Sequence, residues 1–409
     1  MAERMEPTSQ RLLHLDVLRG FALLGILLVN FEWFVRPIQA IVLGADPDLS
    51  GASLVVDWLI MALAEGKFYA LFSMLFGAGF ALMAERASQR DAPFWGLYLR
   101  RLFILLLFGL SHMLLVWAGD ILVVYSLCAF IMVLLFRKTP VQRLWKWAVA
   151  FFAFPLVLVW LGALSIGATV HTDPERHERI MAGFETDAME MRQQVAEALR
   201  IQTEGSWREN VAQRARDGAF LATTAVFWVP SILGFFLLGR WLLVSQRLLK
   251  PDEHKLFFRR WRSRGLLLGL PMSLVAALIM HQTVQIAPTP SMALGMTLAI
   301  VGAVLLALAY LSMVVLGAQR LAFLAPAGQM ALTNYLSQSL FWTWMIYGHG
   351  LGLGPMLPRW SHLFLALAFF ALQLVISHWW MARFRFGPAE WLWRTLIYLK
   401  RQPMRRAPG

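Results

Sequence analysis

The sequence predicts an all-α integral membrane protein with about ten transmembrane helices. Its 409 residues are 59% hydrophobic and 15% charged, whereas soluble domains are about 45–50% apolar and about 25% charged. The apolar residues also form long blocks that a soluble core does not need. These observations exclude a soluble enzyme, a disordered chain and a disulfide-rich scaffold. The single Cys128 permits neither an intramolecular disulfide nor a cysteine zinc site.

Ten apolar spans follow one another along the chain, so both termini lie on the same side of the membrane. The spans are 19–35, 68–84, 102–118, 121–136, 147–168, 220–243, 265–285, 292–316, 330–347 and 362–381. Most of the 37 Lys and Arg residues lie on the side of the termini, and Arg36 and Arg359 are the exceptions in the short loops opposite. The positive-inside rule makes that side cytoplasmic. The net charge of +13 therefore indicates topology and attraction to anionic lipids rather than nucleic-acid binding.

The first apolar run is a retained helix rather than a cleaved signal peptide. It ends in Arg36-Pro37, where a signal peptide would have small residues. The next segment, 51–67, is apolar but ends in Glu65-Gly66-Lys67. Charges so close to a hydrocarbon core predict two pieces, an interfacial or re-entrant helix and a spanning helix that begins near Phe68. A single long tilted helix is the alternative.

The longest polar interruption, 169–219, predicts an extracytoplasmic helical insertion between two five-helix membrane halves, 1–168 and 220–409. Within it, apolar residues recur every three or four positions, which is a helical period. Asp173-Pro174 is a helix start and Gly205-Ser206 a break. We expect a helical cap on the membrane surface or over a cavity; the alternative is a charged linker.

Polar residues at membrane depth are functional candidates because they are costly there unless paired or hydrated. One group lies near the cytoplasmic ends of the spans and is predicted to bind substrate or cofactor. Asp16 and Arg19 share a helical face and form an ion pair or bind an anion. For Asn334 and Gln338 the alternative is interhelical hydrogen bonding, and for Arg240 it is an interfacial position. The group consists of Asp16, Arg19, Arg240, Asn334 and Gln338.

A second group lies near the outer ends and is predicted to do chemistry. His112 and Asp120 are eight residues apart across a tight turn, so a carboxylate can orient a histidine that acts as a general base. Glu65 and Lys67 add a second carboxylate and a cation for an oxyanion or an anionic substrate. The alternative is that Asp120 caps a helix and His112 bonds a neighbouring carbonyl. The group consists of Asn30, Glu32, Glu65, Lys67, His112 and Asp120.

Several familiar signals are missing. No Walker loop, HExxH, GxSxG or GxGxxG motif occurs. The glycine-rich run 348–354 lies in an outer hairpin and predicts a tight turn. The histidines His281, His349, His362 and His378 are too scattered in sequence to predict a metal site.

Four segments together resemble the YeiB-like family of multi-pass bacterial inner-membrane proteins. They are RLLHLDVLRGFALLGILLVN from Arg11, GKFYALFSMLFGAG from Gly66, the stretch 100–122 with Arg100-Arg101, His112 and Gly119-Asp120, and 326–339. They occur in family order over nearly the whole chain except 169–219. The resemblance implies a multi-pass protein of the bacterial cytoplasmic membrane.

The Leu-Asp-x-x-Arg-Gly opening is also similar to that of the heparan-alpha-glucosaminide N-acetyltransferase group of transmembrane acyltransferases. That similarity implies transfer of an acyl group from acyl-CoA to an acceptor across the membrane, with Asp16, Arg19 and Asn30 at matching positions. Those enzymes carry a histidine shortly after the asparagine, whereas 31–50 here contains none. Any histidine base must come from another helix, such as His112.

The leading hypothesis is an acyltransferase that modifies an envelope glycan or lipid. Arg19, Arg240 and the basic loops would bind the phosphates of CoA, His112 with Asp120 would activate the acceptor, and Asn30 or Lys67 would stabilise the oxyanion. A transporter or flippase that uses the same polar residues is the alternative, and a membrane scaffold or sensor is a third. Pairing with a second copy of the chain stays open.

Overall fold

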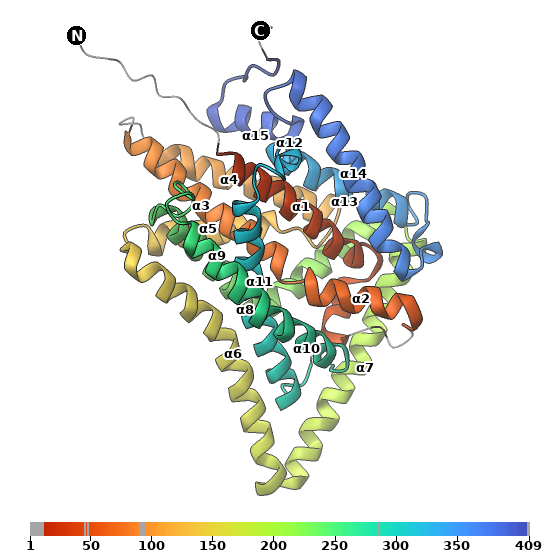
Figure 1. The fold of residues 1–409 in the computed structure, drawn as a ribbon. Coiled ribbons are helices and arrows are strands. Elements are labelled where there is room, and N and C mark those ends of the chain that lie inside the picture. Colours follow the sequence, from red (N-terminus) through yellow and green to blue (C-terminus); the bar gives the residue numbers. More distant parts are fainter. Residues whose placement is uncertain (1–11, 45, 47–48, 90–94, 285, 407–409) are drawn as a thin grey trace, which may run out of the picture.

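The computed structural model is a bundle of helices that run between two ends, which we name by what they hold (Figure 1). It describes residues 12–44, 46, 49–89, 95–284 and 286–406. Helix α1 begins and α15 lies at one end, which we call the basic end, and the turn between α6 and α7 lies at the other, which we call the tip end. The helices are α1 (Leu13–Val35), α2 (Gly51–Leu63), α3 (Lys67–Gln89), α4 (Trp95–Leu115), α5 (Leu122–Phe136), α6 (Val141–Thr172), α7 (Pro174–Glu204), α8 (Trp207–Val244), α9 (Lys255–Arg264), α10 (Leu270–His281), α11 (Pro290–Leu316), α12 (Ala325–Gln329), α13 (Ala331–Ile346), α14 (Arg359–Arg383) and α15 (Pro388–Tyr398).

Each of the ten predicted spans overlaps a helix. In the described part of the chain, eight helical segments are long and apolar enough to cross a membrane. The helices α5 and α13, with 15 and 16 residues, are shorter. One π-helical turn, Gly265–Gly269, joins α9 to α10, and three short 3-10 turns lie at Ile38–Leu43, Ala322–Leu324 and Gly354–Met356. The prediction of an all-helical membrane protein is confirmed.

Segment 51–67 is divided, as its charges predict. Helix α2 ends at Leu63, Gly66 takes a positive φ of 83°, and α3 begins at Lys67. Left-handed backbone suits glycine because it has no Cβ. The single tilted helix is therefore wrong, and a polar break lies between two apolar helices.

Residues 169–219 form less of a separate unit than their polarity suggests. Helix α6 continues to Thr172 and α8 already begins at Trp207, so only α7 lies wholly inside the segment. Asp173 caps α7 by accepting the backbone N–H of Arg176 at 2.9 Å, and Ser206 forms a capping box with Glu209 at the start of α8. The predicted helix start and break are both confirmed.

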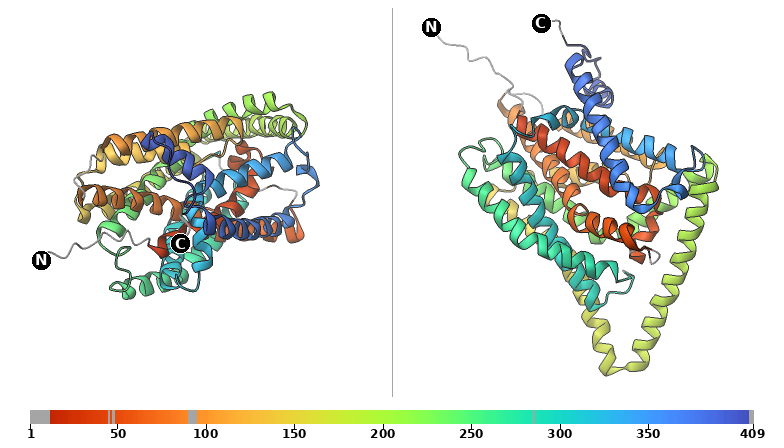
Figure 2. Two further views of the ribbon diagram at one scale, coloured as in Figure 1. Left: turned by 90° about the horizontal axis from the view of Figure 1, so that it is seen from above. Right: turned by 45° about the vertical axis from the view of Figure 1, so that its right-hand side comes forward.

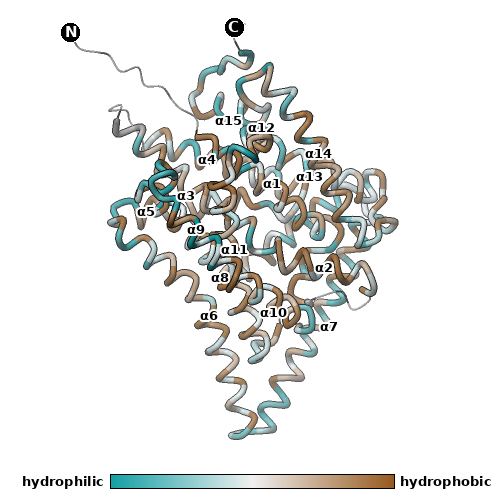
Figure 3. The backbone as a smooth tube through the Cα atoms, viewed as in Figure 1, coloured by the Kyte–Doolittle hydropathy of each residue, from teal (hydrophilic) through white to brown (hydrophobic). Residues whose placement is uncertain are grey.

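Together α6 and α7 form a V that projects at the tip end (Figure 2). The apolar colour of α6 and the polar stretches of α7 follow the two arms (Figure 3). The apolar side of α7 turns inward near its C-terminal end, where Val195 and Leu199 line a cavity of about 990 Å³. There Gln202 Nε2 donates to the carbonyl of Phe34 at 2.7 Å, and the N–H of Gly348 donates to the carbonyl of Gln202 at 2.9 Å.

The centre of the bundle is the crossing of α3 and α8, which glycines make close. A Cβ on Gly77 would lie 1.9 Å from the carbonyl oxygen of Phe236, and one on Gly239 would lie 1.8 Å from that of Met74. Small residues at helix crossings allow backbones to approach where lipid gives no hydrophobic driving force. The pair α3–α8 is the frame on which α4, α5 and α6 pack.

Candidate functional site

His112 and Asp120 face each other across the turn between α4 and α5. Nδ1 of His112 lies 2.7 Å from Oδ2 of Asp120, while Oδ1 of Asp120 accepts the N–H of Val123 at 2.9 Å. Asp120 therefore caps α5 with one oxygen and binds His112 with the other. One carboxylate thus forms both the predicted pair and the helix cap of the alternative, whereas the contacts of the His112 ring among the described residues include no neighbouring carbonyl.

Ser339 of α13 completes this arrangement from the other side of the ring. Its Oγ lies 2.6 Å from Nε2 of His112. If Nδ1 carries the proton donated to Asp120, Nε2 is an acceptor and Ser339 donates to it. All three residues are buried, with exposures of 5%, 6% and 1% for His112, Asp120 and Ser339. A hydroxyl, an imidazole and an orienting carboxylate in this order are the groups of a base-activated nucleophile.

A cavity of about 260 Å³ opens toward the basic end beside this triad. We call it the basic-end cavity. Tyr335, one turn before Ser339 on α13, lines it and also accepts the N–H of Ile121 at 3.2 Å. The Tyr335 hydroxyl lies 3.5 Å from Oδ2 of Asp120. The Tyr335 side chain thus contacts both the cavity and the carboxylate of the triad.

Three arginines from three helices line the same cavity: Arg19, Arg101 and Arg394. The guanidinium of Arg101 lies 4.1 Å from the centre of the Trp393 ring, which fixes its plane. Nη1 of Arg19 lies 2.8 Å from Asp16, so the predicted ion pair is present at the cavity wall. Glu390 lines the cavity as well. Such a cluster of guanidinium groups at a cavity suits phosphate or carboxylate.

Close packing of two glycines holds this region together. A Cβ on Gly20 would lie 2.2 Å from the carbonyl oxygen of Leu324, and one on Gly328 would lie 1.9 Å from that of Asp16. The Leu-Asp-x-x-Arg-Gly segment and the segment that begins at Pro326 therefore meet backbone to backbone. Their contact places Arg19 and Tyr335 on one cavity.

Other predicted binding residues form structural hydrogen bonds. Nδ2 of Asn334 donates to Ser377 at 3.0 Å, and Nε2 of Gln338 donates to Gln373 at 2.8 Å, so both side chains join α13 to α14. Arg240 donates to the carbonyls of Phe136 and Arg137 at the end of α5. Arg240 lines a different groove, with Arg137 and Lys138, at the basic end. Asn30 lies half-buried on α1 and is not among the residues that line the basic-end cavity.

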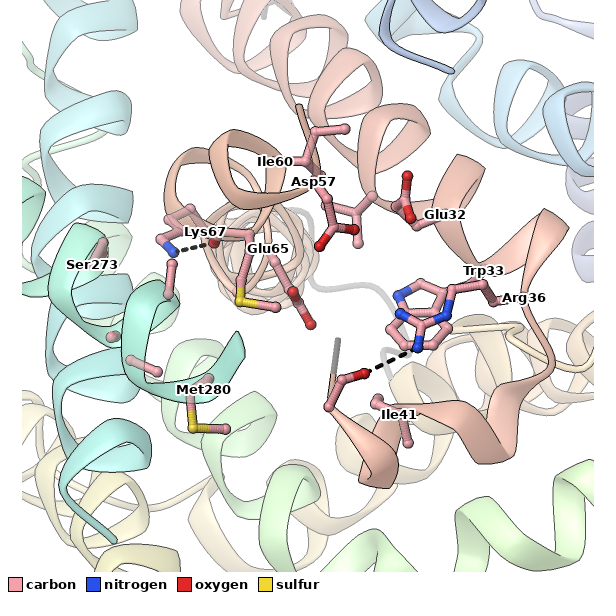
Figure 4. Close-up of a pocket in the computed structure, with 17 residues that line it drawn as sticks. Glu32, Trp33, Arg36, Ile41, Asp57, Ile60, Glu65, Lys67, Ser273 and Met280 are labelled. Atoms are coloured by element: carbon pink, nitrogen blue, oxygen red, sulfur yellow. Dashed lines mark hydrogen bonds between the residues drawn. The ribbon is translucent and has the colours of Figure 1, made fainter. Parts of the chain in front are cut away.

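Glu65 and Lys67 lie elsewhere, at the break between α2 and α3. They line a cavity of about 210 Å³ together with Arg36, Asp57 and Glu32 (Figure 4). We call it the break cavity. His112 and Asp120 do not line it. The predicted outer group thus divides into two separate sites, because α2 and α3 direct their polar residues toward α10 and α14 rather than toward α4.

A buried ionic network that the sequence did not predict forms one wall of the break cavity. Arg359 of α14 contacts both Glu32 of α1 and Asp57 of α2, the latter at 2.7 Å. Nδ1 of His362 lies 3.1 Å from Glu32, and Nε2 of His281 lies 3.5 Å from Asp57. Among the described residues, no group of histidines and acids has the geometry of a metal site. Two features of the sequence could have indicated this network. Asp57 is an acid inside an apolar segment, and Arg359 is an arginine in the loops that carry few positive charges.

Comparison with known proteins gives relatives over the full length. Residues 243–400 match the family described as "Protein of unknown function (DUF418)". The chain is 32% identical to the uncharacterized protein YxaH of Bacillus subtilis, over 97% of this chain and 96% of that one. It is 31% identical to the uncharacterized protein YeiB of Escherichia coli, over 95% and 96%. No solved structure matches.

Proposed function

The chain belongs to the DUF418 family, as a homologue of YeiB and YxaH over nearly its full length, and on that premise we propose that it is a membrane acyltransferase. It would move an acyl group from acyl-CoA to an envelope glycan or lipid. The observation that carries the proposal is the hydrogen-bonded order Ser339–His112–Asp120 beside a cavity lined by arginines. Acyl transfer needs both an activated nucleophile and a site for the anionic part of the donor.

The donor enters from the basic end in this proposal. Arg19, Arg101 and Arg394 bind the phosphates of acyl-CoA, and the flexible pantetheine arm follows the cavity toward Tyr335. A long arm is needed because the arginines line the cavity, whereas no residue of the triad does. The tyrosine side chain must move to admit the thioester to Ser339.

The chemistry uses groups that are already in contact. Oγ of Ser339 bonds to the acyl carbonyl carbon as the carbon–sulfur bond breaks, and the Ser339 proton passes through Nε2 of His112 to the leaving sulfur. An acceptor hydroxyl or amine then gives its proton to His112 and bonds to the acyl carbon, and Ser339 leaves and takes that proton. Asp120 keeps Nδ1 protonated and stabilises the imidazolium in both steps.

The proposed setting is the bacterial cytoplasmic membrane, with the basic end in the cytoplasm. The relatives are bacterial, and acyl-CoA is made in the cytoplasm. The loops 245–254 and 384–406 with α9 and α15 place many arginines at one end of the bundle, as the positive-inside rule requires. The tip end, with α7, then faces the envelope and its acceptors. In this setting α5 and α13 also cross, and anionic lipids contact the basic end.

Incubation of the purified full-length protein in lipid nanodiscs with radiolabelled acetyl-CoA tests the proposal. We expect release of free CoA and one acetyl group on Ser339, located by peptide mass spectrometry. Both signals disappear in Ser339→Ala and His112→Ala. The matched control is Ser337→Ala on the same helix, whose hydroxyl accepts from Gln373 at 2.9 Å instead.

Two other outcomes are informative. If CoA release persists in Ser339→Ala but not in His112→Ala, His112 activates the acceptor directly and the covalent step is wrong. If neither acetyl-CoA nor longer acyl-CoAs are consumed by the wild type, the acyltransferase proposal is wrong.

A transporter or flippase is the second candidate, and the break between α2 and α3 favours it. Interrupted helices with charged residues at the interruption line substrate paths in many transporters, and Glu65 and Lys67 flank Gly66 in a cavity. A transporter needs no acyl donor and returns its substrate unchanged. Substrate uptake by proteoliposomes without acyl-CoA would favour this candidate.

A further inference from the structure

The break cavity contains charged groups of both signs that are only partly satisfied by the protein. Figure 4 shows the carboxylate of Glu65 pointing into the cavity from the α2–α3 break, with Arg36 across from it. Within the described residues, the Glu65 carboxylate makes no hydrogen bond or ion pair. An ionised carboxylate at this depth needs a counter-charge or a proton.

The two cations of the cavity also have donors to spare. Nζ of Lys67 donates to the carbonyl of Met61 at 3.1 Å, which uses one of its three N–H groups. Nη2 of Arg36 donates to the carbonyl of Gly44 at 3.0 Å, and its guanidinium lies 5.5 Å from the Trp33 ring centre. Arg36 therefore has further N–H groups for a ligand.

The other two carboxylates of the cavity wall, Glu32 and Asp57, share one guanidinium. Arg359 contacts Glu32 and Asp57 together, and His362 also bonds Glu32. These groups form an ionic network that joins α1, α2 and α14. Outside this network, the charged groups that line the cavity are one carboxylate, Glu65, and two cations, Arg36 and Lys67.

The break cavity adjoins a larger cavity. Arg36 lines both the break cavity and the larger cavity of about 990 Å³ under α7. Residues of the turn Ile38–Leu43 and of the C-terminal half of α7 also line the larger cavity. The two cavities thus share Arg36, and none of His112, Asp120 and Ser339 lines either of them.

From this arrangement we propose that the break cavity binds a zwitterion, a small molecule or headgroup that carries a primary ammonium and an acidic group. The ammonium donates to Glu65, and the phosphate or carboxylate accepts from Arg36 and Lys67. A volume of about 210 Å³ accommodates a group of this size. The site is independent of acyl transfer, since none of Glu65, Lys67 and Arg36 contacts the triad among the described residues.

Binding to the purified full-length protein in detergent tests the site, by isothermal titration calorimetry with sn-glycero-3-phosphoethanolamine and with β-alanine. We expect at least one of these zwitterions to bind ten times more tightly than ethanolamine, which lacks the acidic group. It should exceed glycerol 3-phosphate, which lacks the ammonium, by the same factor. Equal binding of ethanolamine and the zwitterion would overturn the proposal.

Variants assign the charges. Glu65→Gln and Arg36→Gln should each weaken zwitterion binding at least tenfold, and Lys67→Gln should weaken it less, because its ammonium is partly committed to Met61. Glu185→Gln, an exposed acid on α7, is the matched control and should bind as the wild type does. Zwitterion binding by Glu65→Gln that equals wild-type binding would overturn the proposal. A thermal unfolding transition like that of the wild type would show that the variant folds.

Nanodiscs distinguish the two sources of such a ligand. If the ligand is a lipid headgroup, nanodiscs of phosphatidylethanolamine should stabilise the wild type more than nanodiscs of phosphatidylcholine do. Glu65→Gln should show no such difference. β-Alanine binding without this lipid effect indicates a free zwitterion. If neither effect is observed, Glu65 is simply protonated and the inference is wrong.

Discussion

The hydroxyl of Tyr335 lies 3.5 Å from Oδ2 of Asp120, the oxygen that also binds His112. Tyr335 lines the basic-end cavity with its ring, so a single residue contacts both the proposed donor site and the proposed catalytic carboxylate. This relationship turns two neighbouring features, a cavity and a buried triad, into one testable site.

Removing the hydroxyl in Tyr335→Phe tests that connection. The ring still lines the cavity, and the lost contacts are a long hydrogen bond to Asp120 and the bond accepted from the N–H of Ile121. We therefore expect kcat for acyl transfer to fall about threefold to tenfold. Steady-state CoA release in nanodiscs measures it. A loss of a hundredfold or more would mean that Tyr335 itself transfers a proton.

Asp120→Asn should be far more damaging to catalysis. The amide can still accept the N–H of Val123, so α5 keeps its cap, but it no longer holds Nδ1 of His112 protonated. We expect acylation of Ser339 to slow on the order of a thousandfold or more, with thermal unfolding little changed. Single-turnover acylation provides the measurement. Activity near the wild-type level would reduce Asp120 to a helix cap.

Gly77→Ala and Gly79→Ala are a matched pair on α3. A Cβ on Gly77 would lie 1.9 Å from the Phe236 carbonyl oxygen, whereas one on Gly79 meets nothing within 4 Å. We expect Gly77→Ala to lower the free energy of unfolding by about 1–3 kcal/mol. Gly79→Ala should be neutral or raise it by up to about 1 kcal/mol. Denaturant titration in detergent measures both changes in the free energy of unfolding. Equal changes for the two substitutions would mean that α3 and α8 can move apart at Gly77 without loss of stability.

Glu390 gives the stability a pH dependence. Burial raises the pKa of this carboxyl, although it accepts N–H groups from Leu332 and Thr333 at the start of α13. A carboxyl with a raised folded pKa favours the fold when protonated, and that contribution is lost as the pH rises through the folded pKa.

Glu390→Gln has no such loss, because its amide oxygen accepts the same N–H groups at every pH. We therefore expect the melting temperature of the variant to gain on the wild type as the pH rises from about 4 toward 7. Differential scanning fluorimetry across that range measures the melting temperature of the variant minus that of the wild type. If this difference falls as the pH rises, the N–H groups at the start of α13 stabilise the charged carboxylate more than burial destabilises it.

Cysteine labelling tests the orientation. Cys128 is fully buried, so a new exposed cysteine is labelled with little background. In intact cells an impermeant maleimide should label Met189→Cys on α7 and not Leu256→Cys on α9; both positions are exposed, at 55% and 60%. Labelling of Leu256→Cys alone would invert the proposed topology.

Features of the fold that depend on local chemistry were predictable from the sequence. The break at Gly66 follows from charges beside an apolar run, and the start of α7 follows from Asp173-Pro174. His112 and Asp120 were predictable as a pair because a tight turn joins their helices. Their contact needs no knowledge of how distant helices pack.

Features that depend on packing between distant segments were not predictable. Ser339 is 227 residues from His112, and nothing in the pattern of 330–347 shows which side of that helix meets α4. Asp57 and Arg359 are likewise joined only by the packing of α2 on α14. Glu65 and Lys67 were placed with His112 on depth alone, and depth does not determine which helices are neighbours.

The contacts of Gly77 and Gly239 have a kinematic consequence. With each glycine against a carbonyl of the other helix, rotation or sliding of α3 past α8 drives atoms together, so the two helices move as one rigid body. Any rearrangement that opens the molecule must therefore hinge outside this pair. Gly66, at the junction of α2 and α3, is a pivot that leaves the pair intact.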